Sequence, residues 1–293
     1  MFDRKVLKNR AKYVLTRTLF VSVVACVIVN LVAGGGSGVF GSRMSNVNIQ
    51  GMSSVRLTAT FFVVCLLALV AIGVSIFIAA PLKVGLKHFM LRCADFDGRV
   101  ENLTYPFKNN YKNILWVTFV KNLYVTLWSI LGIIPVVVSF VYFDMGEKIY
   151  ELVELSRMGN GEAATMELSS MFTLLLIAIC IFMIPAYIKS LQYSMVEYIL
   201  AENPNGKAFE IIGRSKEMMV GNKWASVKLE FSFLGWVVLA SFVCCGLGTL
   251  ILNPYIEATY AQMYLEISGQ GKDYGTFDYQ NNYHNPFGGF GNM

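Results

Sequence analysis

The sequence has few charged residues. Asp, Glu, Lys and Arg together make up 15% of its 293 residues, whereas 55% of the residues are hydrophobic. An average soluble domain has about 25% charged residues. A chain this poor in charge is too hydrophobic for a soluble globular protein, and we therefore expect an integral membrane protein.

Catalytic and metal-binding motifs are also missing from the sequence. The chain has two histidines, His88 and His284, and neither belongs to an HExxH motif. No GxSxG elbow, P-loop or dinucleotide fingerprint occurs. Cys244 and Cys245 are adjacent, whereas paired zinc ligands are usually separated by at least two residues. We therefore expect no enzyme activity, no cofactor, no metal site and no nucleic-acid partner.

Long apolar runs dominate the sequence instead. A helix of roughly 20 apolar residues crosses the hydrocarbon core of a bilayer, and lipid requires the backbone polar groups to be paired within the segment. The runs are unbroken, unlike the alternating strands of a barrel. We predict an all-α polytopic bundle, one membrane-embedded domain over 1–268, with six transmembrane spans at about 13–33, 57–80, 114–143, 171–200, 226–245 and 249–268. A five-span alternative, in which the fifth span runs to 251, stays open.

Lysine and arginine are distributed unevenly between the predicted loops. They are concentrated before the first span, between 81 and 113, and between 201 and 225, whereas 34–56 and 144–170 hold two each. Because cytoplasmic loops carry the excess of Lys and Arg, the N-terminus is predicted to be cytoplasmic. Six spans place both termini there. The net charge of +5 then reflects basic faces that meet anionic lipid head groups.

Several segments outside the spans have distinct patterns. Glu147, Glu151 and Glu154 recur at helical spacing within 144–170, which predicts a short amphipathic helix on the outer surface. Residues 206–220 predict an amphipathic cytoplasmic helix whose apolar face, with Ile212 and Met219, packs beneath the bundle or on the inner leaflet. Residues 34–54 are rich in Gly and Ser and predict a mobile outer loop. Residues 269–293 form a Gly-, Asn- and aromatic-rich cytoplasmic tail. Besides membrane lipids, we expect a membrane or envelope protein partner to bind through 144–170, 206–220 or the tail.

Polar residues inside the spans are candidate binding groups, because an ionisable side chain in a membrane is costly. Glu257, counted from Thr249 at 1.5 Å per residue, lies about 12 Å deep in a core about 30 Å thick. We predict Pro254 in the first turn of this helix and Asn253 as its N-cap. Glu257 is predicted to face the bundle, either protonated or hydrogen-bonded. The expected partners are Tyr hydroxyls, Asn122 or Ser129, with Lys121 at a longer reach. The candidate residues are Glu257, Asn253, Tyr260, Tyr264, Asn122, Ser129, Lys121, Lys189 and Glu230.

Several stretches together resemble a known family. They are LKNRAKYVL (7–15), PFKNNYKN (106–113), LWSILGIIP (127–135), IKSLQYSMVEYILAENP (188–204), SKEMMVGNKW (215–224), FSFLGW (231–236) and NPYIEATYAQMY (253–264). From about residue 7 to 267 the chain resembles an uncharacterised bacterial membrane family, catalogued as domain of unknown function 975. The resemblance implies a six-helix plasma-membrane protein and brings no substrate or catalytic residues. An extra segment between Ile134-Pro135 and Ile184-Pro185, which holds the acidic outer helix, departs from the pattern of that family.

The sequence leaves two functions open. The first is an accessory or scaffold subunit that acts through partner proteins or lipids. The second is a small transporter or ligand-binding membrane protein that uses a polar interior around Glu257. One deep charge is a poor basis for a transport cycle, which favours the first.

Overall fold

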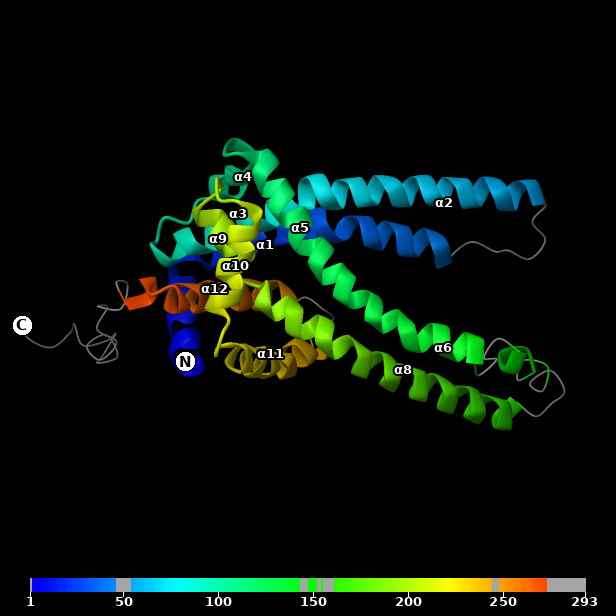
Figure 1. Cartoon of the computed structure of the whole chain (residues 1–293). Coiled ribbons are helices and arrows are strands. Elements are labelled where there is room, and N and C mark those ends of the chain that lie inside the picture. The colour runs from blue at the N-terminus through cyan, green and yellow to red at the C-terminus, as the bar shows by residue number, and fades with distance from the viewer. Residues whose placement is uncertain are drawn as a thin grey trace, which may run out of the picture. The chain divides into compact units, whose positions relative to one another are not determined.

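A computed structural model shows how the chain folds (Figure 1). The structure describes residues 2–45, 54–142, 147–151, 154, 161–243 and 248–272. Every regular element within these ranges is a helix, which confirms the predicted all-helical fold class. The main elements are α1 (Arg4–Ser45), α2 (Ser54–Val74), the π-helical turn η1 (Ser75–Ala79), α3 (Ala80–Ala94), η2 (Val100–Thr104), α4 (Tyr105–Lys108), α5 (Tyr111–Ser129), η3 (Ile130–Ile133), α6 (Ile134–Tyr142), α8 (Gly161–Gln192), α9 (Val196–Glu202), α10 (Ala208–Met218), α11 (Lys223–Val243) and α12 (Gly248–Ile267).

Four helices are long and apolar enough to cross a membrane. They cover Arg4–Ala33, Phe62–Ala94, Tyr111–Val141 and Ser169–Glu202. These ranges overlap the first four predicted spans and are compatible with the predicted membrane class. The predicted spans at 226–245 and 249–268 correspond to α11 and α12, and a crossing by these two helices stays a prediction.

Two helices extend beyond the predicted span ends. α1 continues through Ser45, so the prediction of a loop is wrong for 34–45; the rest of that loop, 46–53, lies outside the described residues. Propagating an existing helix adds one hydrogen bond per residue, and no proline interrupts this stretch, so the glycines weaken the helix without ending it. The second span continues past 80, because Pro81 lies in the first turn of α3, where proline is tolerated.

The chain divides into two compact units, a first unit (Met1–Trp116 with Met195–Met293) and a second unit (Val117–Ser194). In the second unit, η3 and α6 pack against α8. Gly132 approaches α8 so closely that a Cβ on it would meet the Met183 side chain. Most large apolar side chains of α6 and α8 are exposed, as expected for helices that face lipid.

The core of the first unit lies at one end of its long helices. α3 buries Val84, Phe89, Met90 and Cys93, whereas the preceding helix exposes most of its apolar residues from Phe62 to Ile78. The beginning of α1, together with α9, α10 and α12, supplies the rest of this core. α12 buries almost every residue from Ala258 to Leu265. Along this one continuous helix, exposed apolar side chains thus give way to side chains that are buried in the core of the first unit.

The predicted amphipathic helix at 206–220 is confirmed as α10. Ile212 is 2% exposed and Met219, just after the helix, is fully buried. Phe209, at the edge of this buried face, is 72% exposed. The apolar face therefore packs on the first unit.

Replacing Ile212 by alanine is expected to destabilise the protein by about 2 kcal/mol or more, because the change leaves a cavity in a packed core. Phe209→Ala is the matched control, since Phe209 is exposed on the same helix, and it should change stability by no more than about 0.5 kcal/mol. Melting temperatures in mild detergent would measure both. Equal losses for the two variants would contradict the orientation of α10.

The other two predicted partner segments are described only in part. In the acidic segment 144–170, residues 147–151 and 154 are helical, and Glu147, Glu151 and Glu154 are all exposed. In the tail 269–293, residues from 273 onward lie outside the described residues, as do Cys244 and Cys245.

Candidate functional site

The ionic partner of Glu257 is Lys87, whereas the sequence predicted Tyr hydroxyls, Asn122 or Ser129. The Lys87 Nζ lies 2.5 Å from a carboxylate oxygen of Glu257 and donates a hydrogen bond to it. Lys87 comes from α3 and Glu257 from α12, so the pair joins two helices far apart in sequence. The side chains are 15% and 25% exposed, respectively. The pair is therefore largely removed from solvent, where an ion pair is less screened than at an open surface.

Two tyrosine rings, those of Tyr198 and Tyr264, lie next to the Lys87–Glu257 ion pair. The Lys87 Nζ lies 5.2 Å from the ring centroid of Tyr198, within the range of a cation–π contact. The Tyr198 ring stacks on that of Tyr264, with 5.2 Å between centroids. The Tyr264 hydroxyl donates a 2.6 Å hydrogen bond to the Glu202 carboxylate. Residues of α3, α9 and α12 thus form one continuous polar and aromatic cluster.

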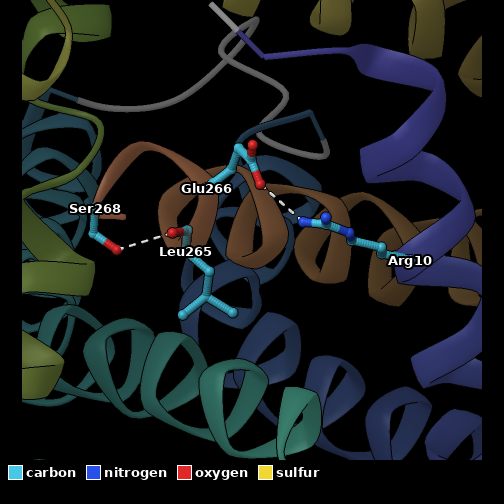
Figure 2. A network of polar contacts seen from close by, with 4 residues as sticks. All are labelled: Arg10, Leu265, Glu266 and Ser268. Atoms are coloured by element: carbon cyan, nitrogen blue, oxygen red, sulfur yellow. Dashed lines mark hydrogen bonds and ion pairs between the residues drawn. The ribbon is translucent and has the colours of Figure 1, made fainter. Parts of the chain in front are cut away.

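A second ion pair fixes the end of α12 (Figure 2). The Arg10 Nη1 lies 2.8 Å from a carboxylate oxygen of Glu266, so α1 and α12 are joined as well. Ser268, just after α12, donates a hydrogen bond to the Leu265 carbonyl. This bond satisfies one of the carbonyls that the end of a helix leaves without an internal partner.

The predicted candidates Tyr260 and Glu230 also meet in the first unit. Glu230 of α11 lies close enough to the Tyr260 hydroxyl to form a hydrogen bond with it. α11 and α12 also meet through Phe233 and Tyr255, whose rings make an edge-to-face contact with 5.5 Å between centroids. These contacts hold the last two helices together beside the Lys87–Glu257 pair.

The predicted start of the last helix is wrong. α12 begins at Gly248, so Pro254 lies inside the helix and Asn253 is not its N-cap. A proline inside a helix lacks the amide that would bond the carbonyl four residues earlier, here that of Leu250. The sequence prediction placed the proline in the first turn because that position would have avoided this loss.

Four predicted candidates belong to the second unit. Lys189 lies with its Nζ 4.8 Å from the ring centroid of Trp128. The Ser129 hydroxyl donates a hydrogen bond to the Val125 carbonyl of its own helix. Asn122 is exposed and Lys121 is half-buried. None of these observations joins the four residues to one another as a binding site, whereas Glu257, Tyr260, Tyr264 and Glu230 lie together in the first unit with Asn253 one turn away.

The sequence did not single out Lys87, Arg10, Tyr198 or Glu202 as site residues. Lys87 and Arg10 were counted only as basic residues of cytoplasmic segments. A helical reading of 81–94 would have placed Lys87 among apolar positions that are buried on the same helix.

The chemistry of the cluster is that of a structural lock. Each carboxylate that joins two helices here already accepts a hydrogen bond from a cation or a phenol. Within the described ranges, no three His, Cys, Asp or Glu side chains gather as a metal site would require. The cluster can hold α3, α9, α11 and α12 in a fixed arrangement.

The family of the chain follows from comparison with known proteins. The model of the family described as "Protein of unknown function (DUF975)" matches residues 1–271. The chain belongs to this family. Its match extends through both ion pairs, Lys87–Glu257 and Arg10–Glu266, and ends just after α12. A search of curated proteins found no match, and a search of solved structures found none either.

Proposed function

We propose that this chain is a non-enzymatic bacterial plasma-membrane protein that acts as an accessory or scaffold subunit, through partner proteins or lipids. Its membership of a family of unknown function and its four apolar helices are compatible with this role. The distribution of Lys and Arg supports a cytoplasmic N-terminus. Six spans or four spans both give an even number, so the C-terminus lies on the same side in either case.

The proposal rests on one observation: Glu257 forms an ion pair with Lys87. Its carboxylate is neutralised by Lys87, and the helix that bears it is tightly packed, with Ala261 at 1% and Met263 at 0% exposure. A transport site needs groups that can bind and release a solute. A carboxylate held by an internal cation inside a close-packed core serves better as a fastener between helices, because close packing leaves few voids.

The outward face of α10 is the best-supported surface for a protein partner. Phe209 is exposed there, with the charged side chains of Glu210, Arg214 and Lys216 around it. Aromatic residues and arginine are enriched where proteins bind each other. The acidic segment with Glu147, Glu151 and Glu154, and the tail from 273 onward, remain further proposed surfaces.

Photo-crosslinking in the native host tests the partner directly. p-Benzoylphenylalanine at position 209 or 214 should give a discrete protein adduct on irradiation, because both side chains point away from the first unit. The same residue at exposed Lys83 of α3 serves as the matched control and should give no such adduct. Adducts with lipid alone at 209 and 214 would contradict a protein partner on α10.

A flux experiment tests the opposite reading, a transporter centred on Glu257. Wild-type protein and the double variant Lys87→Met/Glu257→Leu would be reconstituted in vesicles and assayed for proton and sodium movement. The scaffold proposal predicts the same background leak for both. Flux that the wild type supports and a folded double variant lacks would overturn the proposal.

A further inference from the structure

The position of the water boundary along α3 can be read from what packs on it. η2 and α4 carry the exposed side chains of Glu101 and Lys108. They lie against α3: the Leu103 backbone contacts Gly85, and the Tyr105 ring stacks on His88 with 3.8 Å between centroids. Short irregular backbone and exposed charges are excluded from hydrocarbon. The level of Gly85 to His88 is therefore at the aqueous side of the membrane.

The hydrocarbon-facing part of the same helix begins earlier in the chain. Exposed apolar side chains run from Phe62 to Ile78, and the helix is continuous into α3. At 1.5 Å per residue this stretch is about 24 Å long, close to the thickness of the hydrocarbon core. The second helix thus crosses the core before it reaches the level of Lys87.

α12 runs parallel to α3 and in register with it. Lys87 pairs with Glu257; nine residues further along each chain segment, Phe96 and Glu266 both meet α1. Phe96 contacts Tyr13, with 5.9 Å between ring centroids, and Glu266 pairs with Arg10 on the adjacent turn of α1. The equal spacing means that Glu257 lies at the level of Lys87. On this placement Glu257 lies near the aqueous side, whereas the sequence predicted a depth of about 12 Å.

This register limits how far α12 can reach. Its first residue, Gly248, precedes Glu257 by nine residues, which is about 13 Å along a helix and less than half of a core about 30 Å thick. α2 continues well past the point where α11 and α12 end (Figure 1). Neither α11 nor α12 has the length to reach the outer surface from this position.

The exposed surface of α11 agrees with partial entry. Phe233 contacts Tyr255, so this part of α11 lies near the level of Glu257. Beyond it, Leu234, Trp236, Val238 and Leu239 are exposed, and on α12 Leu250 and Ile251 are exposed as well. An exposed apolar group of this kind needs a partner. Its continuity with the lipid-facing apolar residues of the second helix identifies acyl chains of the inner leaflet as that partner.

We propose that α11 and α12 form a re-entrant pair: both enter the hydrocarbon core from the cytoplasmic side, reach about its middle, and leave on the same side. The protein then has four complete spans. Gly248 supports the close return, because a Cβ on it would meet the Ala240 Cβ at 2.9 Å. The exposed apolar side chains near the end of α11 and the start of α12 then lie among the acyl chains of the inner leaflet. Glu257, Glu230 and Glu266 lie near water.

Spin-label depth measurement in lipid nanodiscs tests this proposal. The six native cysteines are first replaced by Ala or Ser, and the background is accepted if it keeps the wild-type melting temperature. Single cysteines then carry a nitroxide at Phe231, Leu239 or Leu250, with Leu69 as the mid-span reference and Tyr150 as the outer reference. The ratio of collisions with oxygen to collisions with a water-soluble nickel complex reports depth.

The two topologies give different depth profiles. The re-entrant pair predicts that this ratio rises from Phe231 to Leu239 and stays several-fold above the Tyr150 value at Leu250, close to that of Leu69. Six spans predict that it falls back to the Tyr150 value at Leu250, because that residue would lie at the outer surface. The second profile would overturn the proposal, and so would labelling of Leu250→Cys by an impermeant maleimide on intact cells.

Discussion

Replacing Lys87 by methionine is expected to destabilise the protein by about 2 to 3 kcal/mol, near the lower end of what breaking a buried ion pair costs. The variant keeps an apolar chain of similar length, yet leaves the Glu257 carboxylate without its cation in a largely buried place. The loss of stability should be smaller than for a fully buried ion pair, because both side chains are partly exposed to water. The free energy of unfolding in mixed detergent micelles, or the melting temperature, measures the effect.

Further variants test whether the loss of stability in Lys87→Met comes from breaking the Lys87–Glu257 ion pair. Lys83→Met changes an exposed lysine one turn earlier on α3, and should shift stability by no more than about 0.5 kcal/mol. Lys87→Met/Glu257→Leu removes both charges, and should recover most of the loss, since apolar replacement of a buried pair is often neutral. The single variant Glu257→Leu completes the double-mutant cycle. If the double variant lost as much stability as Lys87→Met and Glu257→Leu lose in sum, Lys87 and Glu257 would not be coupled.

Gly85→Ala is expected to destabilise the protein by about 2 to 3 kcal/mol, as much as Lys87→Met does. The added methyl group would overpack a rigid contact. A Cβ at this position would collide with the Leu103 carbonyl oxygen and come within 3.2 Å of the Leu103 Cα. These are backbone atoms, which cannot swing away as the end of a side chain can. The variant should also loosen η2 and α4 from α3, so trypsin should cleave at Lys108 faster than in the wild type.

Gly73→Ala is the matched control for this change. Gly73 lies in the same continuous helix, and nothing lies within 4 Å of the Cβ that alanine would add. Alanine is also the better helix former, by about 1 kcal/mol, so this variant should be neutral or slightly more stable. If both glycine variants melted at the same temperature, the contact between Gly85 and Leu103 would not contribute to stability.

The sequence showed which residues are unfavourable in an apolar segment, but it did not show which residues they contact. Glu257 drew attention because a carboxylate stands in an apolar run, and that reasoning needs only local composition. Its partner Lys87 is 170 residues away in the chain, and no local pattern encodes such a contact. Lys87 also lay beyond residue 80, the predicted end of the second span.

The ends of the helices were less predictable than their existence. Apolar runs identified each long helix, because burial in lipid depends on composition along the segment. Hydrophobicity alone does not show where the side chains of one helix change from exposed to buried in a protein core, as they do between Ile78 and Val84. For the same reason, the apolar content of α12 predicted a span, whereas hydrophobicity does not encode the three side-chain contacts that α12 makes with α1, α3 and α9.

The long separation between Lys87 and Glu257 also sets an order of events during synthesis. Ribosomes add about 5 to 20 residues per second, so Lys87 exists for roughly 10 to 30 s before the codon for Glu257, 170 residues later, is translated. The interval between the synthesis of Arg10 and that of Glu266 is longer still, because these two residues are 256 residues apart. During that interval each cation depends on water or on a chaperone for its solvation. The core of the first unit can therefore close only after α12 has been synthesised, because Lys87 and Arg10 both pair with residues of α12.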